Sequence, residues 1–275
     1  MQQVTNVLRT FEERMIYHSE KCAIHGVQLV EFEGEAQCPK CFTEQENKAL
    51  ELKISNQFEH SNSLYLERKS LLTDLTLLSA SLENYTVTPN TEANLNKQVV
   101  LECVNYLKNG QVFNIILQGK AGAGKSHLAY AILRALNSMK IKSADDKEPV
   151  QKSCAFISFE LMLRKVRESY KKPEQILNEF YFLRLIEQVD FLVIDDLGAE
   201  SGAIDTEKTA TDFVHKFLYA LSTSRQHKVT IYTTNLTSTS LSILYDKKLI
   251  SRFFKKPKFI VFKETKDYRI GDIPF

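Results

Sequence analysis

The stretch VFNIILQGKAGAGKSHLAYAILRAL, residues 112–136, decides the fold of this 275-residue chain. The apolar run at its start predicts a buried strand, and the residues from Lys125 to about Met139 predict a helix. Between them, GKAGAGKS fits the phosphate-loop pattern G-x-x-x-x-G-K-[ST] in full. Glycines let the backbone approach phosphate groups closely, so that successive N–H groups and the helix N-terminus point at the anion. The stretch therefore predicts a nucleotide-binding site, because both flanks argue against a chance match in a glycine-rich turn.

The loop residues have distinct expected roles. We expect Lys125 to reach the β- and γ-phosphates and the Ser126 hydroxyl to ligate Mg²⁺. The residues expected to bind ATP are Gly119, Ala121, Gly122, Ala123, Gly124, Lys125, Ser126 and His127.

Two further segments end in polar side chains after a buried strand. In FLVIDDLGAE (191–200), we expect Asp195 to hold Mg²⁺ and Asp196 to orient or deprotonate the attacking water, although two carboxylates can also simply cap a strand. In IYTTNLT (231–237), we expect Asn235 to position that water, although Asn after a strand is often only a turn former. Ligands bind at the carboxyl ends of strands in open α/β sheets. The three side chains are therefore expected to meet beside the phosphate loop.

Strand and helix patterns alternate through the rest of this region. This alternation predicts an α/β fold with a parallel sheet and helices on both faces. The expected strands are 112–118, 154–158, 191–194, 229–233 and a last one near the C-terminus, and the expected helices are 93–108, 125–139, 159–171, 174–188, about 206–225 and a last one before the final strand.

A cysteine–histidine cluster lies near the N-terminus. Cys22-x-x-His25 and Cys38-x-x-Cys41 form two ligand pairs separated by twelve residues, and three thiolates with one imidazole suit tetrahedral Zn²⁺. The intervening residues favour a hairpin with Gly34 at its turn. His18 is a weaker competing ligand, because it lacks the two-residue spacing from Cys22. The other cysteines, Cys103 and Cys154, lie in apolar contexts and are expected to be small buried hydrophobes.

The composition of the linking region indicates the domain boundaries. Residues 35–109 contain no glycine, which favours helices, and apolar residues recur at helical spacing from Glu44 to about Ser79. The polar segment ENYTVTPNTE (83–92) interrupts the pattern. We expect a zinc-binding module at 1–50, a helical linker at 51–80 and an ATPase domain at 81–275.

Charge and hydropathy exclude some functions. Lys and Arg total 36 and Asp and Glu total 34, so the net charge is only +2. Binding to DNA or a membrane by bulk charge is therefore excluded, while a local basic patch is not. No apolar run approaches the roughly 18 residues of a membrane-spanning helix. The N-terminus shows no secretory signal, so we expect a cytoplasmic protein.

Together, GKAGAGKSHLA, VIDDLGAE, TTNL and the arginine in LISRFF resemble AAA+ ATPases of the helicase-loader branch. The bacterial and phage DnaC/DnaI-type loaders are the family, and the IstB transposition helpers are near relatives. The resemblance covers about residues 81–275. It implies an AAA+ ATPase that associates with itself and delivers a hexameric DnaB-type helicase onto single-stranded DNA in the bacterial cytoplasm. Similar metal modules in DnaI-type loaders imply that the N-terminal region docks on the helicase, and a DNA contact by this module stays open.

The resemblance also implies roles for two arginines. Arg252 occupies the place of an arginine finger that acts on a neighbouring subunit, and a surface ion pair with Asp246 or Glu264 is the alternative. Arg269 lies in KDYR, which resembles the short terminal signature of these loaders. It is expected to contact nucleotide, with a surface carboxylate as the alternative partner.

The helix expected at 159–171 carries a basic set of side chains, Arg164, Lys165 and Arg167. It resembles the channel-lining helix of replication AAA+ proteins, which implies a contact with single-stranded DNA. A solvated basic face is the alternative interpretation.

Three other functions remain to be weighed. An IstB-like helper would act with a transposase and double-stranded DNA. A zinc-bearing adaptor with a vestigial ATPase is disfavoured by the complete set Lys125, Ser126, Asp195 and Asp196. A small-molecule kinase is disfavoured by Asn235 and Arg252, which suit an oligomeric ATPase.

Overall fold

The computed structural model describes residues 16–32, 34–143, 146–172, 174–201, 210–265 and 267. The chain divides into two compact units, Met1–Phe58 and Glu59–Phe275. The boundary between them falls within one long helix, α2 (Pro39–Ser63).

The larger unit is built on a five-stranded sheet with the order β10-β4-β9-β8-β7. Every neighbouring pair in it is parallel, which confirms the predicted parallel α/β sheet. The strands are β4 (Asn114–Gly119), β7 (Cys154–Ser158), β8 (Phe191–Asp195), β9 (Val229–Thr234) and β10 (Pro257–Phe262).

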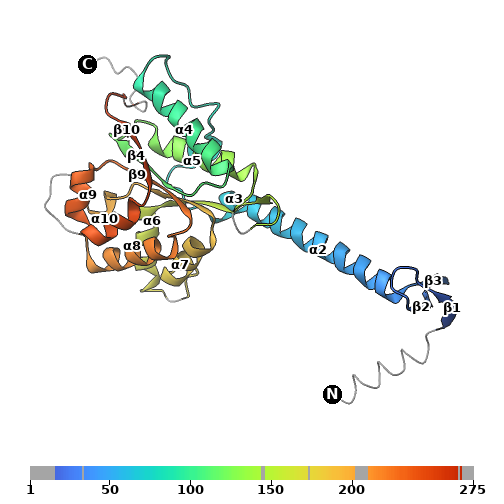
Figure 1. Ribbon diagram of the computed structural model, residues 1–275. Helices are drawn as coiled ribbons and strands as arrows, with labels where there is room; N and C mark the ends of the chain where they lie inside the picture. Colours follow the sequence, from blue (N-terminus) through green and yellow to red (C-terminus); the bar gives the residue numbers. More distant parts are fainter. Residues whose placement is uncertain are drawn as a thin grey trace. The chain divides into compact units, whose positions relative to one another are not determined.

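Helices cover both faces of this sheet (Figure 1). One face packs on α4 and α5, and the other packs on α6, α7 and α8 together with α9 and α10. Their bounds are α4 (Glu92–Lys108), α5 (Lys125–Asn137), α6 (Phe159–Ser169), α7 (Glu179–Gln188), α8 (Asp212–Ser224), α9 (Ser238–Leu244) and α10 (Lys247–Phe253). A small hairpin pairs β5 (Lys140–Ile141) with β6 (Val150–Gln151).

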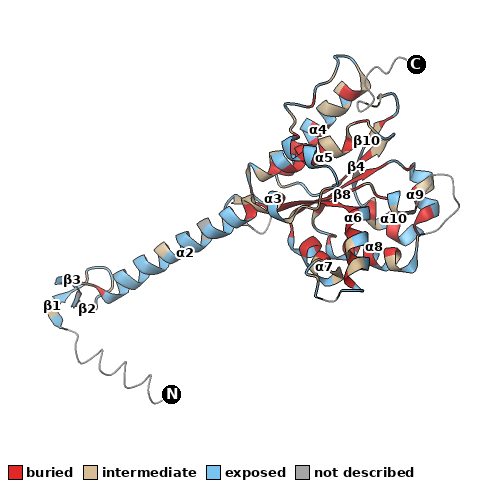
Figure 2. Cartoon of the chain, turned by 180° about the vertical axis from the view of Figure 1, so that it is seen from behind, coloured by how far each residue is buried: buried red, intermediate tan, exposed pale blue. Residues whose placement is uncertain are grey.

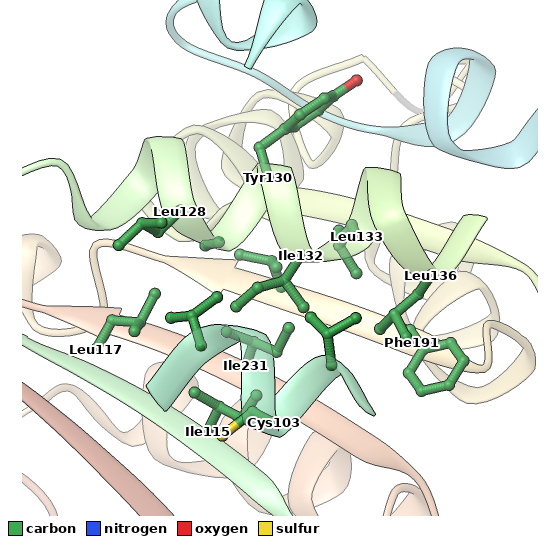
Figure 3. Packing of buried hydrophobic residues seen from close by; sticks show 14 of the residues in the cluster. Cys103, Ile115, Leu117, Leu128, Tyr130, Ile132, Leu133, Leu136, Phe191 and Ile231 are labelled. Atoms are coloured by element: carbon green, nitrogen blue, oxygen red, sulfur yellow. The ribbon is translucent and has the colours of Figure 1, made fainter. Parts of the chain in front are cut away.

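Alternation along β4 divides the core into two layers. Ile115 and Leu117 pack with the α4–α5 layer, whereas Ile116 packs with the opposite layer, as the two-residue period of a strand requires. Figure 3 shows Leu128 and Ile132 of α5 directed at the sheet, while the Tyr130 hydroxyl points away from it. The sheet is accordingly buried on both faces (Figure 2), which explains why its strands read as continuous apolar runs.

Two helices begin later than the sequence pattern suggests. The helix expected from 174 begins at Glu179, because the Asn178 side chain caps it by accepting from the Tyr181 N–H at 2.9 Å. The helix expected from about 206 is described from Asp212, where Thr211 caps it, and residues 202–209 lie outside the described residues.

The predicted linker region contributes its second half to the larger unit. After α2 come α3 (Tyr65–Lys69) and the 3-10 helix η1 (Leu75–Ser79). Leu66 and Leu77 are buried in the α4–α5 layer of the core. Leu71 forms a parallel β-bridge with Ile157 of β7, so the larger unit begins at Glu59 rather than near residue 81.

The smaller unit contains a three-stranded antiparallel sheet, β1-β2-β3. Its strands are β1 (Tyr17–Lys21), β2 (Gln28–Phe32) and β3 (Glu35–Gln37). Gly34 turns between β2 and β3 with φ +82°, a left-handed value that favours glycine. The hairpin between the two ligand pairs is confirmed. None of the helices in the described part of the chain combines the length and the apolar character that crossing a bilayer requires.

Glu92, the first residue of α4, anchors the segment that follows β10. Its carboxylate accepts hydrogen bonds from the backbone N–H groups of Lys263, Glu264 and Thr265 at 2.7–2.9 Å and from the Thr265 hydroxyl at 2.8 Å. Partial burial acts to raise the pKa of Glu92, but these hydrogen bonds outweigh it and hold the pKa below its ordinary value.

Glu92→Gln is expected to lower the free energy of unfolding at pH 7 by about 1–2 kcal/mol, because a neutral amide with one acceptor oxygen replaces a charged acceptor. The folded-state pKa is depressed, so this contribution is complete above the unfolded-state pKa and is lost as the pH falls through the folded-state value. Thermal unfolding from pH 7 to pH 3 should show the difference between parent and variant shrinking. A difference that stays constant over this range, or an equal effect of the exposed neighbour Glu264→Gln, would contradict the assignment.

Candidate functional site

A pocket of about 290 Å³ lies where β4, β8 and β9 end. It brings together most of the residues expected to bind ATP and Mg²⁺. Its lining includes the expected residues Ala121, Gly122, Gly124, Lys125, Ser126, His127, Asp195, Asp196 and Asn235, and adds Thr73, Asp74, Thr76 and Leu77.

Lys125 is held in position by polar partners. It is buried, and its Nζ donates to the Asn235 Oδ1 at 2.8 Å and to the Lys120 carbonyl at 2.7 Å. The ammonium group thus connects the phosphate loop to the end of β9. An incoming phosphate would meet a cation that is already oriented, which lowers the entropic cost of binding.

Asp195 lies at the end of β8 and is buried. Its Oδ1 accepts from the Thr233 hydroxyl at 2.7 Å, and Ser126 also hydrogen-bonds to its side chain. Burial, together with the charge of Asp196, raises the pKa of Asp195 to about 6. A carboxylate and a hydroxyl in contact are hard oxygen ligands of the kind Mg²⁺ prefers. This pair therefore fits the cation that would accompany ATP.

Asp196 has an unusual backbone conformation. Its φ is +56°, in the left-handed region, and its N–H donates to the Thr233 hydroxyl at 2.8 Å. The next residue is fixed to the same strand, because the Leu197 N–H donates to the Thr233 carbonyl at 2.9 Å and the Thr234 hydroxyl donates to the Leu197 carbonyl at 2.7 Å. This strained position persists because β9 holds the turn on both sides.

The phosphate loop needs two of its glycines for different reasons. Gly124 caps α5 with φ +83°, and a Cβ there would lie 2.8 Å from the Tyr85 ring. Gly122 has φ +73°, and a Cβ there would overlap the Asp267 carboxylate. The Tyr85 ring also packs at a tilt against the ring of His127, with the two centroids 5.5 Å apart. Sequence reasoning identified neither Tyr85 nor Asp267, because no motif links them to the loop.

The pocket wall formed by Thr73–Leu77 was also missed by the sequence analysis, which placed this segment in the linker. Asp74 accepts from the Thr76 N–H at 2.9 Å and from its hydroxyl at 2.7 Å. Asp74 thereby caps η1 and fixes the wall. The sequence contained a signal for this wall, because Asp74 stands two residues before Thr76 and an Asp side chain commonly hydrogen-bonds the backbone two residues further on.

Arg252 does not line this pocket. It lines a second cavity of about 410 Å³, which also contains Thr230 at the opposite end of β9. Its guanidinium donates to the Thr223 hydroxyl at 2.7 Å and the Tyr219 hydroxyl at 2.9 Å, and it stacks 4.3 Å above the Tyr219 ring. Among the described residues, Arg252 forms no ion pair with Asp246 or Glu264.

The expected DNA-binding residues lie on α6. Arg164 and Arg167 are exposed, Lys165 pairs with Glu168 at 3.1 Å, and the charge of Arg167 acts on Glu200. Arg269 lies outside the described residues.

Cys22, His25, Cys38 and Cys41 meet in the smaller unit, with all four ligand atoms within 4.8 Å of one another. The His25 Nδ1 lies 3.8, 3.6 and 3.3 Å from the Sγ atoms of Cys22, Cys38 and Cys41. The Cys22 and Cys41 sulfurs are 3.7 Å apart. A tetrahedron with Zn–S bonds of about 2.3 Å has edges of about 3.8 Å, so the spacing fits Zn²⁺. His18 is not part of this cluster.

The surroundings of this cluster orient the ring of His25 and shift the pKa values of two of its cysteines. The His25 Nε2 contacts the Glu44 carboxylate at 3.1 Å, an arrangement that fixes the ring of a metal-ligating histidine. Backbone hydrogen bonds from His25 and Ile24 lower the pKa of Cys22 to about 6. Desolvation and the neighbouring thiols raise the pKa of Cys41 to about 11. By contrast, Cys103 and Cys154 are buried in the core, as expected.

The comparisons with known proteins concern the fold. No protein-family model matches this sequence, and no curated protein is similar to it. The crystal structure of the DnaC helicase loader superposes with a TM-score of 0.54 at 21% identity, over 69% of this chain and 100% of that one. The fold is the AAA+ α/β fold. DnaI is similar at a TM-score of 0.54 and 19% identity, over 70% of this chain and 95% of that one.

A third AAA+ structure, DnaA from Aquifex aeolicus bound to AMPPCP, has a TM-score of 0.52 at 20% identity. The match covers 71% of this chain and 54% of DnaA. The larger unit therefore has the same AAA+ fold as these structures.

Proposed function

We propose that this chain is an ATP-dependent loader that binds a hexameric DnaB-type DNA helicase and delivers it onto single-stranded DNA during replication initiation. The observation that carries the proposal is the pairing of two sites in one chain. A complete phosphate-loop pocket lies in a unit with the fold of the DnaC helicase loader, and a four-ligand metal cluster lies in a separate unit. Such a loader acts in the bacterial cytoplasm, whether a bacterium or its phage supplies it.

The pocket residues predicted from the sequence would divide the tasks of hydrolysis among them. The phosphate loop and Lys125 would bind the triphosphate, and Ser126 and Asp195 would hold Mg²⁺, which neutralises the charge on the phosphates. Asp196 and Asn235 would orient the water that attacks the γ-phosphate. Arg269 is proposed to contact the same nucleotide.

The smaller unit is proposed to bind Zn²⁺ and to dock on the helicase. A sheet of three short strands cannot bury a core large enough to fold alone, so the metal would supply folding energy. The AAA+ unit would associate with further copies of itself.

Co-purification with a hexameric helicase, with and without ATP, tests the proposal. We expect the parent chain to capture the helicase in a manner that depends on ATP. In Lys125→Ala, the capture should no longer depend on ATP. Lys120→Ala is the matched control, because the hydrogen bond from Lys125 goes to the backbone carbonyl of Lys120, which alanine keeps. Capture of a transposase in place of the helicase, with preference for double-stranded DNA, would favour the IstB-like alternative.

Replacing Arg164, Lys165 and Arg167 together with alanine is expected to weaken binding of single-stranded DNA. For a single strand, each phosphate that the protein neutralises contributes about 0.7 to the steepness of log K against log salt. The slope should therefore become shallower by about 2 if all three residues contact phosphate, as measured by fluorescence anisotropy with ATP present. The double variant Lys171→Ala/Lys172→Ala, just beyond α6, is the control. An unchanged slope in the triple variant would move the DNA site elsewhere.

A further inference from the structure

Glu200 carries a partly buried carboxylate that the expected ATPase chemistry does not use. It lies in the short 3-10 helix η2 (Ala199–Ser201), four residues after Asp196. Its Oε2 accepts from the Gly198 N–H at 2.9 Å, and its Oε1 accepts from the Tyr245 hydroxyl. Burial raises the pKa of Glu200 although both hydrogen bonds oppose the shift. A buried carboxylate is costly unless it is well bonded, so this arrangement has to repay its desolvation.

Tyr245 connects this carboxylate to the helices that follow β9. It lies between α9 and α10 and is 1% exposed. Its ring packs edge-on against Phe253, the last residue of α10, at 6.2 Å. Arg252 is the neighbour of Phe253 on the same helix. One phenolic side chain thus contacts both the turn after Asp196 and the helix that carries Arg252.

The turn between Asp196 and Glu200 has little freedom to move. Gly198 has φ +99°, and a Cβ there would lie 2.4 Å from the Leu236 side chain. β9 holds the start of the turn through Thr233 and Thr234, and Glu200 and Tyr245 hold its end. The printed bonds from β9 reach the turn as far as Leu197, and Glu200 and Tyr245 add an attachment at its far end.

We propose that Glu200 and Tyr245 form a positioning pair that keeps the Asp196 carboxylate oriented for the attacking water and links this orientation to the position of α10. Neither residue of the pair lines the phosphate-loop pocket, so the pair is not expected to touch the nucleotide. It acts through the Asp196 turn. This inference rests on the proposed ATPase activity and adds to it two residues outside the phosphate-loop pocket.

Tyr245→Phe tests the pair with the smallest change, because it removes one hydroxyl and keeps the buried ring. We expect the affinity for ATP to be unchanged and kcat to fall roughly tenfold to a hundredfold, since a misplacement of about 1 Å at a reacting group costs about that much. Binding of ADP with aluminium fluoride, which mimics the transferring phosphoryl group, should weaken by a similar factor. Tyr130→Phe is the matched control, because Tyr130 is 2% exposed and its hydroxyl points away from the sheet (Figure 3).

A second variant, Glu200→Gln, and the combination Glu200→Gln/Tyr245→Phe separate positioning from folding. If the two residues act as one unit, the double variant should lose no more kcat than the more impaired single variant. Three outcomes would overturn the pair. The kcat losses of the two single variants could multiply in the double variant, or the affinity for ATP could fall together with kcat. The third outcome is a kcat for Tyr245→Phe equal to that of the Tyr130→Phe control. A parent chain that binds ATP but neither hydrolyses it nor prefers the fluoride analogue would refute the ATPase proposal itself, and the pair with it.

Discussion

Arg252→Ala is expected to reduce ATP hydrolysis by roughly 10³-fold or more while leaving ATP binding intact. Arginine fingers contribute 10³–10⁵ in rate in well-studied GTPases, because the planar guanidinium never titrates and contacts two phosphate oxygens at once. Arg252→Lys should recover only part of the rate, since an ammonium is a point charge without this fork. Removing the guanidinium from the Tyr219 ring costs little stability, because Tyr219 is partly exposed.

Arg252 and the phosphate loop line two different cavities, which lie toward opposite ends of β9. Thr230 lines the cavity of Arg252, and Asn235 lines the phosphate-loop pocket. The five residue steps from Thr230 to Asn235 span about 16 Å of extended chain. The cavity around Arg252 also contains Arg225, Lys228, Lys255 and Lys256, and no carboxylate is found among the described residues that line it.

Mixing of variants tests action on a neighbouring subunit. Arg252→Ala keeps its own phosphate loop, and Lys125→Ala keeps its Arg252. Each alone should be inactive, whereas mixed assemblies contain some junctions with both parts intact and should regain partial turnover with helicase and single-stranded DNA present. Lys248→Ala, an exposed position on the same helix, is the control. Near-parental hydrolysis by Arg252→Ala, or no recovery in verified mixtures, would contradict the assignment.

Cys38→Ser is expected to abolish zinc binding and unfold the smaller unit. Structural zinc supplies about 10–16 kcal/mol to zinc-finger peptides at neutral pH, far more than three short strands could provide. Cys38 is 7% exposed and close to His25, so a serine would leave a buried hydroxyl in place of a thiolate ligand. The expected results are a metal content near zero, rapid proteolysis before α2, and loss of helicase binding with ATP binding retained.

Glu44→Gln provides a graded control for this result. Losing the carboxylate partner of a metal-ligating histidine typically costs 10–100-fold in metal affinity, so this variant should bind zinc more weakly yet still fold in excess metal. Zinc titration against a chelating dye distinguishes the two variants. Unchanged helicase affinity in a zinc-free Cys38→Ser protein would remove the smaller unit from the helicase interface.

The sheet was predictable because its strands are local patterns. The strand expected at 154–158 is β7 itself, and the phosphate loop, the two aspartates and Asn235 converge because parallel strands end at one edge. Predicting these features requires only a short apolar run, a turn after it, and the assumption that the strands are parallel.

The features that the sequence did not predict depend on contacts between residues that are distant in the chain. Arg225 shows this most clearly: it reads as a surface residue but is buried, and burial lowers its pKa to about 10. Its guanidinium donates to the Thr230 hydroxyl and to the carbonyls of Ile186, Val189, Asp190 and Val229. Neither the spacing nor the composition of the sequence signals such contacts.

The β-bridge at Leu71 has a consequence for the handling of this protein. β7 is the edge strand of the sheet, and Leu71 occupies its open side. The Leu71 N–H donates to the Phe156 carbonyl at 2.7 Å, and the Ser158 N–H donates to the Leu71 carbonyl at 2.8 Å. Exposed edge strands template aggregation between chains. A fragment that starts at residue 81 would expose the edge of β7 and is expected to aggregate. A fragment that starts at Glu59 would keep this edge covered and is expected to stay monodisperse.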